Sequence, residues 1–174
     1  MELNSTVACI CEGNAERAIM DLLLENNLLI FNEEQLLDGE IIRCRNGKKF
    51  ESRYLNKRFK EKITVLRILD SRRENFKLSK AYQHQVDVIN IITAPEIEIL
   101  IILCEDKYKE FNKSGLKPSE YCKATLKMKD VKSGKTVRDY FKDIEKLKFA
   151  IQKYKQIKKV KKGEKTLLDL LRNI

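Results

Sequence analysis

The run ITVLRILD (Ile63–Asp70) decides the fold class of this 174-residue chain. It is a short, mainly apolar segment that ends at a polar residue, which is typical of a buried strand. Two similar runs, Thr6–Cys11 and Val86–Thr93, lie before and after it. Apolar residues at helical spacing follow the first run over Ala15–Asn27. Strands alternating with helices predict an α/β domain with a mostly parallel, Rossmann-like sheet flanked by helices.

Further helices are predicted on both sides of the third run. Lys48–Lys62 has the pattern of a helix with basic residues facing outward. A second helix is expected from Thr93 to about Lys113, because Thr93 and Glu96 have the spacing of a capping box.

The last third of the chain is predicted to be helical throughout. Pro118 is placed to open one helix, and Ser133-Gly134 is expected to break the chain after it. Apolar residues from Val137 to Tyr154, at spacings of three and four, then predict one long amphipathic helix that Gly163 ends. We therefore expect an α/β core over residues 1–113 and a basic helical extension over residues 114–174 that packs on it as part of a single domain.

The charge is unevenly distributed. The chain has 36 Lys and Arg against 26 Asp and Glu, a net charge of +10. Residues 1–106 carry 15 basic and 18 acidic side chains, whereas residues 107–162 carry 19 and 6. An excess of positive charge confined to one part of a chain favours binding of a polyanion there.

The composition also bears on the cellular location. Ile99–Cys104, the longest apolar run near the centre, is far shorter than the ~18 residues that cross a bilayer, so no membrane segment is expected. Five cysteines, an odd number, fit reduced thiols in the cytoplasm better than a disulfide framework.

Two acidic residues stand directly after predicted strands. Glu12 follows the first run and Asp70 follows the second. The carboxyl ends of parallel strands share one edge of a sheet, where paired carboxylates could bind Mg²⁺. The alternative is that both are ordinary solvated residues at strand ends.

Three short motifs resemble those of Toprim domains. Cys11–Glu16 (CEGNAE) is similar to the first motif, where a glutamate precedes a glycine between strand and helix. Ile68–Arg72 (ILDSR) stands where a strand followed by Asp-x-Asp is expected. Thr93–Leu103 (TAPEIEILIIL) resembles the Pro-x-x-Glu helix start of small Toprim-like proteins from bacterial abortive-infection and phage-defence systems. The resemblance spans roughly residues 5–113.

The resemblance implies a Mg²⁺-dependent enzyme that cleaves or transfers nucleic-acid phosphodiesters. It implies that Glu12 is a general acid/base or metal-bridging residue, that Asp70 is a metal ligand and that Glu98 is a supporting acid. Glu98 also interrupts an apolar run, and a buried carboxylate needs a partner.

One position departs from the motif. Arg72 stands where the second aspartate is expected, and a guanidinium cannot bind Mg²⁺. Either Glu74, Glu98 or Glu16 supplies the missing oxygen, or the metal site is degraded. Glu16 has a simpler explanation, because a carboxylate in the first turn of a helix is favoured by the helix dipole.

Basic residues in three segments are predicted to hold DNA or RNA. They are Arg53, Lys57, Arg58, Arg72, Arg73, Lys155, Lys158 and Lys159. Lysine attracts phosphates without reading the sequence, so this binding should be non-specific and sensitive to salt.

Three functions therefore compete. The first is a Mg²⁺-dependent nuclease, and the second is a nucleic-acid-binding module with a degraded metal site. The third is an interaction or effector subunit, in which the apolar stripe between Tyr140 and Tyr154 binds a protein partner or a second copy of the chain.

Overall fold

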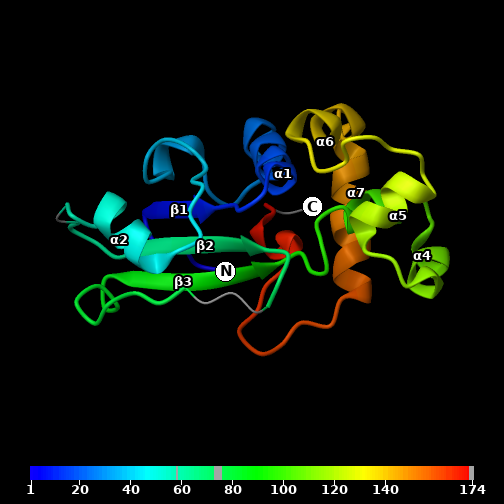
Figure 1. Cartoon of the computed structure of the whole chain (residues 1–174). Helices are drawn as coiled ribbons and strands as arrows, with labels where there is room; N and C mark the ends of the chain where they lie inside the picture. The colour runs from blue at the N-terminus through cyan, green and yellow to red at the C-terminus, as the bar shows by residue number, and fades with distance from the viewer. Residues whose placement is uncertain (58, 73–75, 173–174) are drawn as a thin grey trace.

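The computed structural model describes residues 1–57, 59–72 and 76–172, and Figure 1 shows the arrangement of their elements. Three parallel strands, β1 (Thr6–Ile10), β2 (Ile63–Leu69) and β3 (Val86–Ile92), form one sheet in the order β1-β2-β3. The predicted α/β fold with a parallel sheet and a helical C-terminal part is confirmed. In Figure 1 the strands point toward this helical part.

Alternation along the strands produces one apolar core on each face of the sheet. Val65 packs with Phe50 of α2 (Gly47–Tyr54) on one face. Leu66 belongs to the larger core on the other face, which includes side chains of α1 (Asn14–Glu25). Both faces of a parallel sheet must be covered, which explains why β2 is buried along its whole length.

Further helices complete the described part of the chain. The α-helices are α3 (Ile99–Cys104), α4 (Tyr108–Ser114), α5 (Pro118–Ala124), α6 (Gly134–Tyr140) and α7 (Ile144–Ile157), and the 3₁₀ helices are η1 (Glu33–Gln35) and η2 (Leu167–Leu170). The start of α5 at Pro118 is as predicted. No helix in the described ranges is both long and apolar enough to cross a membrane.

The helix predicted from Thr93 is wrong in its start and its length. The Thr93 hydroxyl donates to the carbonyl of Leu69 at 3.0 Å instead of capping a helix, and α3 begins only at Ile99. Asp106 then adopts a left-handed backbone conformation with φ of 52°. This conformation ends helical hydrogen bonding, so α4 is a separate helix.

The predicted helix over Lys48–Lys62 is also too long, because α2 ends at Tyr54. The predicted helix over Val137–Tyr154 is two helices. Asp143 separates them, since its carboxylate accepts from the backbone N–H of Glu145 at 3.0 Å and caps α7.

The apolar stripe of α7 lies inside the chain. Leu147, Ile151 and Tyr154 are each at most 2% exposed and belong to the larger core. The stripe therefore offers no free face, and a protein partner or homodimer through it is not supported.

The C-terminal segment returns to the free edge of β3. The N–H of Lys165 donates to the carbonyl of Asn90 at 3.0 Å, and the N–H of Ile92 donates to the carbonyl of Lys165 at 2.7 Å. The Tyr154 hydroxyl donates to the carbonyl of Ala94 at 2.8 Å. These contacts hold α7 and the segment after it beside the carboxyl ends of the strands.

Candidate functional site

A cavity of about 70 Å³ at the carboxyl edge of the sheet brings two predicted site residues together. Asp70 follows β2 directly and Glu98 precedes α3, and both line this cavity. Glu16 and Lys132 line it as well. We call these four side chains the carboxylate pocket. These four residues, of which any two are at least 28 positions apart in the sequence, therefore lie together at the edge where parallel sheets commonly bind ligands.

Glu98 is a buried acid of the carboxylate pocket and, like Glu16, is only 4% exposed. Burial raises the pKa of Glu98 to about 7, and the neighbouring charges of Glu96 and Glu16 act in the same direction. Lys132 opposes this shift. Without a further cation, Glu98 is therefore close to half protonated at neutral pH.

Lys132 pairs with Glu96, and its charge also interacts with those of Glu98 and Asp70. Its ammonium donates to the Glu96 carboxylate at 2.8 Å, and the backbone N–H of Ser119 donates to the same carboxylate at 2.9 Å. Although burial acts in the opposite direction, these hydrogen bonds hold the pKa of Glu96 below its ordinary value. Glu96 thus ties α5 to the loop before α3 and is not the capping residue that its spacing predicted. Of the described side chains that line the carboxylate pocket, three are acidic and one is basic.

A wider, open pocket of about 720 Å³ adjoins the carboxylate pocket at Asp70, which lines both. Lys117 and Lys158 also line the open pocket. Burial and the nearby charge of Arg72 lower the pKa of Lys158 from its ordinary value. Two ammonium groups beside a carboxylate can hold an anionic group that extends across the end of the sheet.

Arg72 is engaged with the C-terminal segment. Its guanidinium binds Glu164 in a bidentate fashion, with distances of 2.8 and 2.9 Å, and donates to the carbonyl of Lys159 at 3.1 Å. The hydrogen bond from Arg72 holds the pKa of Glu164 at about 2. Arg72 therefore fastens the segment after α7 to the strand edge.

Glu12 has different surroundings from Asp70 and Glu98. Its carboxylate lies 3.1 Å from Nε of Arg45 and 3.8 Å from Nη2 of Arg67. Glu12 is not among the described residues that line the carboxylate pocket. Although Glu12 stands at the predicted edge, the structure surrounds it with two positive charges.

Arg67 is a site residue that the sequence analysis missed. It lies within β2 and is 3% exposed, and its guanidinium stacks 4.8 Å from the centre of the Phe76 ring. In the sheet it stands level with Ile10 and Asn90. A single charged residue in an apolar strand was the available signal, of the same kind that pointed to Glu98.

Glu16 has the structural role that its position in the first turn of α1 favours. Its carboxylate accepts from the backbone N–H groups of Glu12 and Gly13, at 3.0 and 2.7 Å. These bonds fix the turn between β1 and α1.

The predicted nucleic-acid residues are spread over three places. Lys158 lines the open pocket, Lys155 pairs with Asp169 at 2.7 Å, and Lys159 is exposed beyond α7. Arg53 stacks 5.2 Å from the centre of the Tyr54 ring, and Lys57 is exposed after α2. Arg58, Arg73 and the alternative ligand Glu74 lie outside the described residues.

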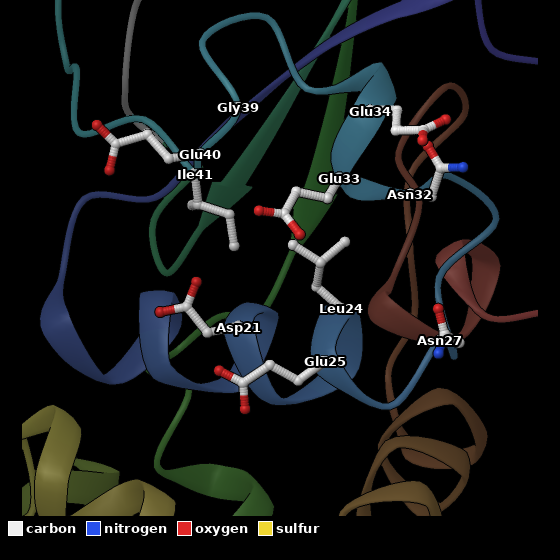
Figure 2. Close-up of a pocket in the computed structure, with 10 residues that line it drawn as sticks. All are labelled: Asp21, Leu24, Glu25, Asn27, Asn32, Glu33, Glu34, Gly39, Glu40 and Ile41. Atoms are coloured by element: carbon white, nitrogen blue, oxygen red, sulfur yellow. The ribbon is translucent and has the colours of Figure 1, made fainter.

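An acidic hollow lies on another part of the surface. Figure 2 shows Asp21 and Glu25 on α1, and Glu33 and Glu40 on the segments that lie opposite this helix. Its volume is about 580 Å³. Glu25 and Glu40 pair with Arg138 and Arg17, at 2.6 and 2.8 Å. A polyanion would be repelled from this surface.

The chemistry of the carboxylate pocket favours a hard cation. Within the described ranges, no three His, Cys, Asp or Glu side chains form a complete metal site. Asp70 and Glu98 could still bind Mg²⁺, which commonly takes one or two protein carboxylates and completes its coordination with water and substrate phosphate. Comparison with models of protein families, with curated proteins and with solved structures found no match to this chain.

Proposed function

We propose that the protein is a Mg²⁺-dependent enzyme that hydrolyses nucleic-acid phosphodiesters at the carboxylate pocket. The observation that carries the proposal is that Asp70 and Glu98 line one cavity beside an open, lysine-lined pocket. Oxygen ligands next to an anion-binding surface are what phosphoryl chemistry requires of a protein.

Asp70 and Glu98 would hold the cation in this proposal. Bound Mg²⁺ would supply Lewis-acid polarisation of a phosphate oxygen. Lys117 and Lys158 would position the phosphates on either side of the scissile bond in the open pocket. Arg72, through Glu164, would keep the segment that carries Lys158 in place.

The proposed role of Glu12 differs from the one that the Toprim resemblance implies. A carboxylate between Arg45 and Arg67 is already neutralised, so we assign it to positioning the turn after β1.

The proposed setting is the bacterial cytoplasm. All five cysteines are free thiols, which fits that compartment, and a role in phage defence rests on the resemblance alone.

A cleavage assay tests the proposal. Labelled single-stranded DNA, duplex DNA and RNA would be incubated with the protein in Mg²⁺ or in EDTA. We expect cleavage only with Mg²⁺, and we expect Asp70→Asn to lower the rate by roughly 100-fold or more, since a metal ligand contributes several kcal/mol to the transition state.

The matched control is Asp87→Asn. Asp87 lies at the amino end of β3, where it pairs with Lys62 at 3.2 Å. Its substitution by Asn should therefore leave the rate of cleavage unchanged. Cleavage in EDTA, or equal cleavage by the wild type and Asp70→Asn, would contradict the proposal.

The second candidate is a nucleic-acid-binding module without catalysis. The two arginines beside Glu12 favour it, because their charges neutralise one of the acids at the edge of the sheet and so leave fewer carboxylates to hold a cation. This candidate predicts binding that weakens steeply with salt and needs no Mg²⁺.

A further inference from the structure

A second pocket, of about 340 Å³, lies beside the N-terminus of α2 and is lined by basic side chains. Arg43, Arg45, Lys49 and Arg53 all line it, and no acidic residue of the described ranges does. We call it the arginine pocket. Its volume falls in the range of small-molecule sites, and its charge selects an anion.

The basic side chains of the arginine pocket are largely uncompensated. Arg45 pairs with Glu12, but Arg43, Lys49 and Arg53 form no ion pair with any residue that the structure describes. The like charges of Arg43, Lys49 and Arg53 around one cavity repel one another, and an anion between them would relieve this repulsion. Guanidinium groups bind phosphate with paired, charge-assisted hydrogen bonds, so phosphate is the anion that they fit best.

The donors of this pocket are side chains rather than the helix end. The side chain of Asn46 already accepts from the N–H groups of Lys48 and Lys49, at 2.9 and 3.2 Å. The first turn of α2 is thus capped by the protein itself. Phosphate binding must depend on the arginines and on Lys49.

An aromatic ring completes the lining. Tyr54 is half-buried, and its ring lies 5.2 Å from the Phe50 ring, which fixes it on the core. A fixed ring at the wall of a phosphate-binding cavity can stack on a nucleobase. The Arg53 guanidinium lies 5.2 Å from the centre of the Tyr54 ring, so a base that stacks there takes the place of the exposed Arg53 side chain.

From these observations we propose that the arginine pocket binds a nucleotide unit, with its phosphate among Arg43, Arg45 and Lys49 and its base against Tyr54. The unit is either a free nucleotide or one nucleotide of a strand. This site is separate from the carboxylate pocket and needs no metal, so the two proposals can fail independently.

Calorimetric titration in EDTA tests the site without any cleavage. The probes are a nucleoside 5′-monophosphate, the same nucleoside without phosphate, and a short single strand with a 5′-phosphate. We expect the monophosphate to bind at least tenfold more tightly than the nucleoside. Equal affinity of the strand and the monophosphate identifies a free or terminal nucleotide as the ligand, whereas tighter, salt-sensitive binding of the strand identifies an internal one.

Neighbouring lysines provide a matched control. Lys49→Gln removes a lining cation and should weaken nucleotide binding about tenfold, since one charge-assisted hydrogen bond is lost. Lys48→Gln removes an exposed cation of the same helix that is not among the described residues lining the pocket, and it should leave the affinity unchanged.

The ring is tested in the same way. Tyr54→Phe keeps the ring and should bind the monophosphate like the wild type, whereas Tyr54→Leu should bind it more weakly with inorganic phosphate unaffected. The proposal is overturned if neither the nucleotide nor the strand binds, or if Lys48→Gln and Lys49→Gln weaken binding equally.

Discussion

Glu12 and Glu98 are both buried glutamates at the carboxyl edge of the sheet, but their electrostatic surroundings are opposite. Glu12 lies between two guanidinium groups. Glu98 shares the single ammonium of Lys132 with Glu96 and lines a cavity with Asp70 and Glu16. A buried carboxylate is stable only with a counter-charge, so Glu12 is satisfied by the protein and Glu98 is left to attract a cation or a proton. The position of an acid at a strand end therefore does not by itself define its role.

The largest expected effect is on stability, from Glu12→Gln. This change leaves Arg67, only 3% exposed, without its counter-charge from Glu12. Breaking a buried pair from one side costs about 3–5 kcal/mol of unfolding free energy. Chemical denaturation of the wild type and the variant measures this loss.

The double variant Glu12→Gln/Arg67→Met is the control for that pair. It removes both charges and should recover a substantial part of the lost stability. If the double variant loses as much unfolding free energy as Glu12→Gln and Arg67→Met lose together, the two residues do not stabilise each other. Glu12 would then not be satisfied by Arg67, and its proposed difference from Glu98 would be contradicted.

The second effect is a pH dependence that comes from Glu98. A carboxyl group with a folded-state pKa raised from 4.5 to about 7 holds its proton more tightly in the folded protein. Wild-type stability should therefore fall as the pH rises from about 4.5 to 7, by at most about 3 kcal/mol. Glu98→Gln should lack this fall.

Thermal unfolding in EDTA between pH 5 and 8 measures the difference. We expect the two proteins to differ little at pH 5 and the variant to be the more stable at pH 8. A constant difference across this range would show that Glu98 keeps an ordinary pKa and that its surroundings resemble those of Glu12.

The smallest effect concerns Glu164 and Arg72. Because the pKa of Glu164 is lowered to about 2, its carboxylate stabilises the fold above pH 4.5, and this contribution is lost as the pH falls toward 2. The pair is partly exposed, so Glu164→Gln should cost less than about 1 kcal/mol. The gap in melting temperature between wild type and variant should narrow from pH 6 to pH 3. A gap in melting temperature that widens toward low pH would contradict a lowered pKa of Glu164.

The sheet could be predicted from the sequence, whereas much of the site could not. Apolar runs located all three strands, because a buried parallel strand needs apolar side chains on both faces. Helix ends were harder, since they depend on single residues such as Asp106, with its left-handed backbone, and Asp143, with its cap.

The partners of the site residues depend on contacts between distant segments. Glu98 and Arg67 each interrupt an apolar run, and this pattern indicates a buried charge without identifying its partner. Arg72 and Glu164 are 92 residues apart, and no periodicity relates them. Arg45 reaches Glu12 from a loop, where the sequence carries no repeating pattern.

The central claim is that Asp70 and Glu98, and not Glu12, hold the cation. Calorimetric titration of Mg²⁺ into the wild type, Asp70→Asn and Glu12→Gln, each checked for folding by circular dichroism at the titration temperature, tests it most directly. We expect Mg²⁺ to bind the wild type and Glu12→Gln with similar affinity, and we expect Asp70→Asn to bind Mg²⁺ about tenfold or more weakly, because one charged ligand is removed. Loss of binding in folded Glu12→Gln with retention in Asp70→Asn would contradict it.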